Sequence, residues 1–293
     1  MSRPLVLKVG GELIEGELIE EEAGHLATVV SAVAAVVDDV AGLVVVHGGG
    51  REIDRALQRE GIPKQQVDGL RLTDEPTLAV VVAVLAGIVN PRFVAALNAA
   101  GVRAVGLTGA DGCCMRATPA PPHLAADGRL VDLGRVGVPA AGSDTRLIDT
   151  LLSAGFVPVL ASIGADGRGH LLNVNADTMA GALAARLGAR RLVIAGATPG
   201  VVSAGGGTVP QLDPAGIAGL IEDRTATAGM IAKLRACEHA LAHGVEEVLI
   251  VNGRDRSALV DAAHGRQPAG ATMITAGRRR HGGHGLKAVP HNV

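Results

Sequence analysis

Short apolar runs alternate with longer amphipathic segments along most of the chain. The apolar runs are rich in Val, Ile and Leu, which is typical of buried strands, and the segments between them place apolar residues at helical spacing. This alternation predicts an α/β protein with a mainly parallel sheet covered by helices on both faces. The predicted strands are residues 4–9, 43–46, 104–107, 157–161, 191–195 and 247–251. The predicted helices are 21–37, 51–59, 77–100, 144–154, 214–221 and 230–243, with two more beginning at Asp177 or Thr178 and at Asp255. Hairpins are predicted at residues 128–137 and 205–207.

Specific residues mark where the long apolar helix at residues 77–100 begins and where it is expected to kink or break. Thr73 or Asp74 precedes it and is expected to cap its first turn. Pro91 lies inside the helical pattern and predicts a kink or break near Asn90, because proline lacks the amide hydrogen that the helix needs.

A glycine triplet separates the strand at residues 43–46 from the helix that follows it. Gly48, Gly49 and Gly50 remove every Cβ from this turn, so their amides can point into one space at the positive end of the helix. Such a turn is suited to binding an anion. A tight turn without a ligand is the alternative, and the triplet alone gives both interpretations equal weight.

Composition narrows the class of protein. With 27 Lys and Arg against 29 Asp and Glu, the charge gives no reason to expect binding to nucleic acid or to an anionic membrane. Phe93 and Phe156 are the two aromatic residues, so base-stacking surfaces are nearly excluded. Cys113, Cys114 and Cys237 lack zinc-ligand spacing and suit a reducing compartment. With no export signal or membrane span recognised, a cytoplasmic protein is expected.

Several further segments carry chemistry-bearing residues. Neither a P-loop lysine motif nor a GxGxxG turn after a strand is present. Lys8 lies near the end of a predicted strand, just before two glycines. Arg71, Asp177 and Lys233 are further candidate site residues, and each lies in a different segment of the chain. The segments are KVGG, HGGGREID, VDGLRLTDEPT, NVNADTMAGALAARLGA and GMIAKL.

In this order, from about residue 8 to residue 274, these segments resemble the amino acid kinase family, and more narrowly its acetylglutamate kinases. The resemblance implies a three-layer αβα sandwich with a mainly parallel central sheet. It implies an N-terminal lobe at 1–188 for amino-acid binding and dimerisation, and a nucleotide-binding C-terminal lobe at 189–275. The basic tail at 276–293 has no apolar period and is expected to be disordered.

The implied reaction is transfer of the ATP γ-phosphoryl group to the side-chain carboxylate of N-acetyl-L-glutamate, a step of arginine biosynthesis. A carboxylate with a pKa of about 4.3 is already ionised at neutral pH, so this acceptor needs no general base. Catalysis then requires alignment and neutralisation of charge by lysines, amides and magnesium carried by ATP.

The resemblance also assigns roles to individual residues. It implies that Lys8 and Lys233 stabilise the transition state and that Asp177 holds both lysines; an ordinary helix N-cap is the alternative for Asp177, and surface charge is the alternative for the lysines. The implied acceptor-binding residues are Gly49, Gly50, Arg71 and Asn173. The implied nucleotide-binding residues are Gly10, Gly11, Ala197, Gly200, Val201, Val202, Thr225 and Thr227.

Two conspicuous residues are not expected to be catalytic. His47 closes a strand and is interpreted as packed and hydrogen-bonded, because this reaction needs no proton transfer. Asp111 in TGADG is interpreted as a turn residue.

The chain departs from the family pattern at Gly196 and Ala197, where a Thr-Asp or Ser-Asp pair is usual. A regulatory paralogue with impaired nucleotide binding is therefore one alternative function, and a kinase for carrier-bound aminoadipate in lysine biosynthesis is another. Retention of Lys8, Asp177 and Lys233 favours a kinase. Because the first strand begins almost at once, a homodimer without arginine feedback is expected. The helix at 77–100 is its candidate interface, and a wholly buried helix is the alternative interpretation of the same pattern.

Overall fold

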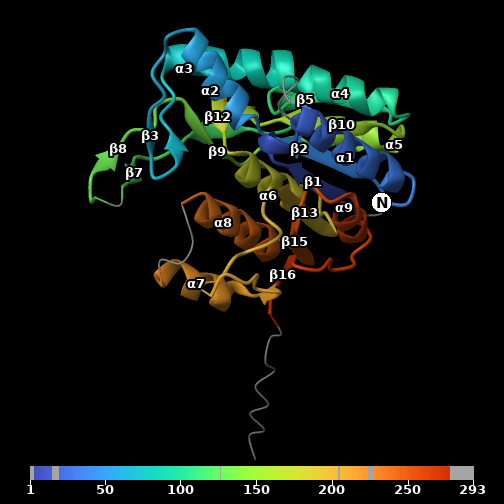
Figure 1. Ribbon diagram of the computed structural model, residues 1–293. Helices are drawn as coiled ribbons and strands as arrows, with labels where there is room; N and C mark the ends of the chain where they lie inside the picture. Colours follow the sequence, from blue (N-terminus) through green and yellow to red (C-terminus); the bar gives the residue numbers. More distant parts are fainter. Residues whose placement is uncertain (1–2, 15–19, 126, 204, 224–227, 278–293) are drawn as a thin grey trace, which may run out of the picture.

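The computed structural model describes residues 3–14, 20–125, 127–203, 205–223 and 228–277 (Figure 1). An eight-stranded sheet forms its centre, in the order β14-β16-β15-β13-β1-β2-β10-β5. These strands are β1 (Leu5–Val9), β2 (Leu43–His47), β5 (Ala104–Thr108), β10 (Val157–Ala161), β13 (Arg191–Gly196), β14 (Gln211–Leu212), β15 (Glu247–Asn252) and β16 (Thr272–Thr275). The predicted strands are thus all present, and β14 and β16 were not predicted.

Strand β1 lies in the middle of this sheet and pairs in parallel with β13 on one side and β2 on the other. Among the strand pairs that the described residues form in this sheet, β15 and β16 are antiparallel and the others are parallel. Alternate side chains of β1 enter opposite layers of the core: Leu5 and Leu7 pack on one face, and Val6 packs on the other. A mainly parallel sheet that is buried on both faces confirms the predicted fold class.

Helices from different parts of the chain cover the two faces. One layer of the core contains α1 (Glu20–Val36), α2 (Gly50–Arg59) and α9 (Arg256–Ala263) with the long helix described next. The other contains α5 (Arg146–Ser153), α6 (Ala176–Arg186), α7 (Pro214–Glu222) and α8 (Ala228–Ala242). The predicted helices therefore match the observed ones to within a few residues.

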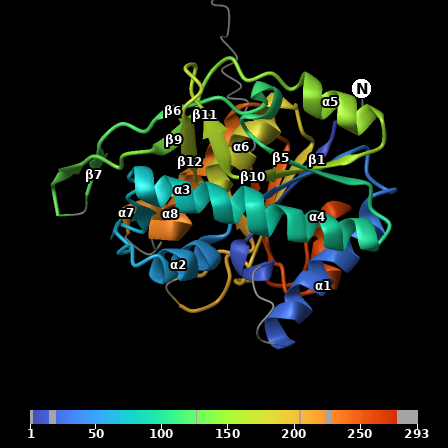
Figure 2. The ribbon, with the colours of Figure 1, turned by 90° about the horizontal axis from the view of Figure 1, so that it is seen from above.

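The long apolar helix runs unbroken across the molecule as α3 (Glu75–Val84), a π-helical turn (Leu85–Val89) and α4 (Asn90–Ala99) (Figure 2). Asp74 caps it by accepting a hydrogen bond from the amide of Thr77. Of the kink or break predicted near Asn90, the break is wrong, because one helix continues through Pro91. The π turn instead widens the helix just before the proline, and this relieves the clash that its ring would make.

By length and composition this helix, residues 75–99, passes the test for a membrane span, with a mean hydropathy of 2.1. Val81, Val89 and Phe93 are nevertheless fully buried in the protein core. The amide group of Asn90 donates hydrogen bonds to His47 and to the carbonyl of Val159. These contacts are those of a core helix that packs on the sheet.

A second, four-stranded sheet stands beside the first, in the order β11-β12-β9-β6. Its strands are β6 (Ala117–Pro119), β9 (Val136–Pro139), β11 (Ile163–Ala165) and β12 (Leu171–Val174). Two small hairpins are formed by β3 (Gln66–Val67) with β4 (Leu70–Arg71) and by β7 (His123–Leu124) with β8 (Leu130–Val131).

The hairpin predicted at residues 128–137 is wrong, because its two strands pair elsewhere. Strand β8 pairs with β7, whereas β9 pairs with β6 and β12. Between them Leu133 is buried, and its carbonyl accepts a hydrogen bond from the amide of Thr73. This distant contact holds the intervening segment away from a tight turn. At 205–207 a hairpin does form, with an antiparallel bridge between Val202 and Thr208.

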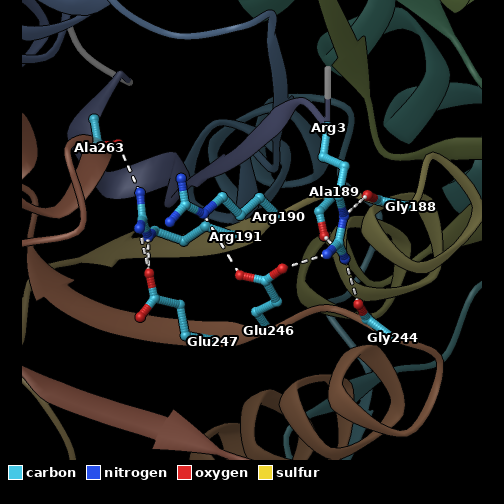
Figure 3. Close-up of polar contacts among 9 residues, drawn as sticks. All are labelled: Arg3, Gly188, Ala189, Arg190, Arg191, Gly244, Glu246, Glu247 and Ala263. Carbon is cyan, nitrogen blue, oxygen red and sulfur yellow. Dashed lines mark hydrogen bonds and ion pairs between the residues drawn. The ribbon is translucent and has the colours of Figure 1, made fainter. Parts of the chain in front are cut away.

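Arginines tie the sheet together at the amino ends of its central strands (Figure 3). Arg3 pairs with Glu246 and donates to the carbonyls of Gly188 and Gly244, just beyond the ends of α6 and α8. The buried Arg191 at the start of β13 pairs with Glu247 at the start of β15. These contacts cross the predicted boundary between residues 1–188 and 189–275. The division into two lobes stays a prediction.

Candidate functional site

The carboxyl ends of the central strands surround a cavity of about 300 Å³. Helices α2 and α6 both begin at its wall, so the positive ends of two helix dipoles face the same space and favour an anion there. Five glycines leave parts of the wall without side chains, namely Gly11, Gly48, Gly49, Gly50 and Gly69. The predicted glycine turn thus lies at a cavity suited to a negatively charged ligand.

The start of α6 is set by a cap that leaves Asp177 available. The side chain of Asn175 accepts a hydrogen bond from the amide of Thr178 and caps the helix. The interpretation of Asp177 as the N-cap is therefore wrong. Asp177 stands one residue inside the first turn, and its buried carboxylate faces the cavity.

Lys8 of β1 forms an ion pair with Asp177, with 2.9 Å between Nζ and Oδ1. Both side chains are almost completely buried. Burial alone lowers the pKa of Lys8, but the charge and hydrogen bond of Asp177, aided by the charge of Glu12, hold that pKa above its ordinary value. Lys8 therefore presents a fixed positive charge to the cavity.

Lys233 of α8 lies near the Lys8–Asp177 pair. Asp177, Lys8 and Glu12 all act electrostatically on its ammonium group, although Lys233 does not line the cavity itself. Burial and the positive charge of Lys8 lower the pKa of Lys233, and the two carboxylates oppose this shift. The structure thus brings together Lys8, Lys233 and Asp177, the three residues to which the family resemblance assigns catalytic roles.

Glu12 is a member of this cluster that the sequence analysis missed. It stands in a 3₁₀ turn (Gly11–Leu13) after β1, and its Oε1 accepts a hydrogen bond from the amide of Ala197 at 3.0 Å. Its carboxylate lies directly over Gly10, where a Cβ would be only 2.5 Å from either oxygen. The signal available in the sequence was an acidic residue immediately after the Gly10–Gly11 pair.

Arg71 of β4 lines the cavity, and one nitrogen of its guanidinium group is held by an ion pair with Asp54. Its Nη2 lies 2.5 Å from Oδ1 of Asp54, which also pairs with Lys64. Burial raises the pKa of Asp54, but the hydrogen bonds from Lys64 and Arg71 outweigh this effect and lower it. The Nη1 atom of Arg71 is buried and has no hydrogen-bond partner among the described residues. That donor remains available to an acceptor in the cavity.

Asn173 of β12 lies on the cavity wall, and its side chain donates to Oγ1 of Thr73 at 3.1 Å. The carbonyl oxygen of the same amide remains as a further polar group of the wall. Ser162, directly after β10, also lines the cavity and was not selected from the sequence. It had no motif to distinguish it, since only the fold brings the end of β10 to this place.

His47 is a structural residue, as expected. Its ring is fully buried, with Nδ1 donating to the carbonyl of Gly48 and Nε2 accepting from Asn90, which requires the neutral form. Burial lowers its pKa to about 4. Asp111 accepts two hydrogen bonds from Thr108 and forms the predicted turn.

Of the predicted nucleotide-binding residues, Gly11 lines the cavity, whereas Ala197 and residues 200–202 lie outside its wall. Ala197 contacts Glu12 through its amide, while Gly200 and Val201 pack tightly on Thr272. Val202 is 43% exposed. The predicted residues Thr225 and Thr227 lie outside the described residues. Their nucleotide-binding roles stay predictions.

A family model for the amino acid kinase family matches residues 3–252. The chain belongs to the amino acid kinase family. It is similar to acetylglutamate kinase from Oleidesulfovibrio alaskensis, with 42% identity over 214 residues that cover 72% of each chain. It is 41% identical to acetylglutamate kinase from Erythrobacter litoralis over 257 residues, 86% of this chain and 83% of the relative.

A solved structure extends this comparison to the fold. N-acetylglutamate synthase from Neisseria gonorrhoeae, complexed with coenzyme A and N-acetyl-glutamate, matches with a TM-score of 0.77 and 26% identity. The match covers 93% of this chain and 59% of that protein. As a member of a kinase family, the chain acts on small-molecule substrates and is expected to use ATP.

Proposed function

We propose that this protein is an acetylglutamate kinase, which transfers the ATP γ-phosphoryl group to the side-chain carboxylate of N-acetyl-L-glutamate in arginine biosynthesis. The observation that carries the proposal is the buried Lys8–Asp177 pair beside a cavity that also holds the free donor of Arg71. Relatives over 40% identical that carry this name support it.

The proposed reaction makes one bond between a carboxylate oxygen of the acceptor and the γ-phosphorus, and breaks the bond from that phosphorus to the β–γ bridging oxygen. The products are N-acetyl-L-glutamyl 5-phosphate and ADP. Lys8 and Lys233 neutralise charge on the transferring group, and Asp177 keeps Lys8 oriented. Arg71 binds the α-carboxylate of the acceptor, with Gly49, Gly50 and Asn173 as its further contacts.

Magnesium is proposed to enter with the phosphates of ATP. Among the described residues no group of three or more His, Cys, Asp and Glu side chains is placed to hold a metal ion. A cation carried by the nucleotide fits this arrangement, because magnesium usually keeps several waters and few protein ligands. Gly10 and Gly11 are proposed to lie against the phosphates, whereas the amide of Ala197 is already bonded to Glu12.

A trapping assay tests the proposal. Purified protein, magnesium and ATP are incubated with hydroxylamine, which converts an acyl phosphate to a hydroxamate, and N-acetylglutamate is compared with glutamate and aminoadipate. We expect hydroxamate with N-acetylglutamate. Product with aminoadipate alone would indicate the related lysine-pathway activity, and no product with any acceptor would favour an amino-acid-binding regulator.

We propose a cytoplasmic homodimer. The exposed residues of the long helix between Ala79 and Ala95 are small or apolar, and Ile88 among them is 43% exposed. An apolar helix face of this kind is suited to pack against its own copy across a two-fold axis. Gel filtration with light scattering is expected to give a dimer, and Ile88→Arg is expected to give a monomer; a hexamer would contradict this proposal.

A further inference from the structure

Gly196 and Ala197, at the end of β13, carry no polar side chain, although the family pattern has one at each position. The structure places the carboxylate of Glu12 at this point instead. Oε1 of Glu12 lies 3.0 Å from the amide nitrogen of Ala197. It also lies 3.4 Å from the position that a Cβ of Gly196 would take. A side chain from the neighbouring β1 turn thus occupies the space that these two small residues leave.

The ammonium group of Lys233 also lies beside Gly196. Its Nζ is 3.5 Å from the same Cβ position of Gly196, on a side chain that comes from α8. Four charges therefore meet at the ends of β1 and β13: Lys8, Lys233, Asp177 and Glu12. Asp177 is paired directly with Lys8, so it is not free to neutralise Lys233 alone.

We propose that Glu12 is a positioning residue for Lys233: its carboxylate, fixed by the amide of Ala197, holds the charged ammonium group of Lys233 beside Lys8. The physical need arises because two buried lysines repel each other and lose hydration. With Asp177 as the sole counter-ion, one of the two positive charges would be poorly compensated. Glu12 supplies the second counter-ion from a turn whose backbone is already tied to β13.

Three further groups act on the ammonium group of Lys233 besides Glu12. Asp177 approaches it from α6, Lys8 from β1 and Cys237 from its own helix. Burial raises the pKa of the Cys237 thiol, so this group is uncharged at neutral pH. Glu238, also on α8, pairs with Arg235 and is not among the groups that shift the pKa of Lys233. Removal of charge from Glu238 is therefore a matched control for removal of charge from Glu12.

The first test is independent of turnover. The chain has four lysines, so protein labelled with ¹³C and ¹⁵N in lysine gives few side-chain resonances to assign. In Glu12→Gln the acceptor for the Ala197 amide remains while the charge is lost. We expect the titration midpoint of Lys233 to move to lower pH by about one unit relative to the unmodified chain. Glu238→Gln is expected to leave it unchanged, and an unchanged midpoint in Glu12→Gln would overturn the proposal.

The second test follows kcat against pH and rests on the proposed kinase function. The basic limb of the Glu12→Gln profile is expected to move to lower pH together with the Lys233 midpoint, with acceptor KM within about twofold of its original value. Glu12→Ala also frees the Ala197 amide, so hydrogen exchange at that amide is expected to accelerate. If Glu12→Gln lowers the thermal stability but shifts neither the Lys233 titration midpoint nor the basic limb of the kcat profile, Glu12 has a purely structural role and the proposal is wrong. If the unmodified chain shows no turnover, the proposed function fails, while the NMR titration still decides the role of Glu12.

Discussion

The backbone of α6 at Gly181 lies against the carbonyl group of Ala236 in α8. A Cβ at Gly181 would be 2.6 Å from that carbonyl oxygen, closer than side-chain carbons approach other atoms. Glycine therefore permits the two helices to pack at short range. This contact matters for the site because α6 carries Asp177 and α8 carries Lys233.

Gly181→Ala is expected to push α8 away from α6 and to lower kcat. We expect a cost of about 1–3 kcal/mol in the free energy of unfolding, as is typical of overpacking in a close contact. Urea denaturation and steady-state kinetics check this. Gly219→Ala in α7, where a Cβ meets nothing within 4 Å, is the control. Equal effects of both substitutions would contradict the proposed geometry.

Lys8→Ala is expected to lower kcat by about 10²–10³-fold, because a fixed positive charge at the transferring group is lost. Acceptor binding, measured by calorimetry without ATP, is expected to change much less. Lys8→Arg keeps the charge with a different geometry and is expected to recover part of the loss. If Lys8→Ala weakens acceptor binding and leaves kcat intact, the assigned role is wrong.

Arg71→Ala is expected to raise the KM for N-acetylglutamate by about 10–100-fold, the typical loss for a hydrogen bond to a charged group. The reason is that the unpartnered Nη1 is the donor proposed to meet the α-carboxylate. The KM for ATP is expected to stay within about twofold. Arg129→Ala, which removes a 73% exposed arginine side chain, controls for a simple change of net charge.

The free energy of unfolding is expected to depend on pH through His47. Burial depresses the pKa of the folded histidine to about 4, so as the pH falls below about 6.5 the unfolded chain takes up a proton first. This group alone is expected to cost about 3 kcal/mol of stability between pH 7 and pH 4. Denaturation curves of the unmodified chain and of His47→Gln, compared over this range, isolate the contribution. An identical pH dependence in both proteins would show that His47 is not buried as the neutral form.

The local elements were predictable because their causes are local. Runs such as 43–47 and 157–161 have the apolar, β-branched composition of buried strands, and Asp74 and Asp255 cap the helices expected after them. Lys8, Asp177 and Lys233 were assigned as catalytic because their segments follow one another in the order typical of the family. The neutral, packed role of His47 followed from the absence of any proton transfer in the expected reaction.

Pairing partners and long-range contacts were not predictable, since periodicity shows which face of a strand is buried and not which strand lies beside it. The failed hairpin at 128–137 has this origin. Glu12 illustrates the same point within the site, because its partner Ala197 is 185 residues away along the chain.

The sequence by itself determined the alternation of strands and helices, the glycine turn at Gly48–Gly50 and the family to which the chain belongs, because each is recorded in residue types at short spacing. Only the tertiary structure decided that Asn175 caps α6, that Asp177 pairs with Lys8, and that Glu12 and Lys233 both lie beside Gly196. These relationships depend on how neighbouring strands bring their carboxyl ends together, and no spacing within one segment records that.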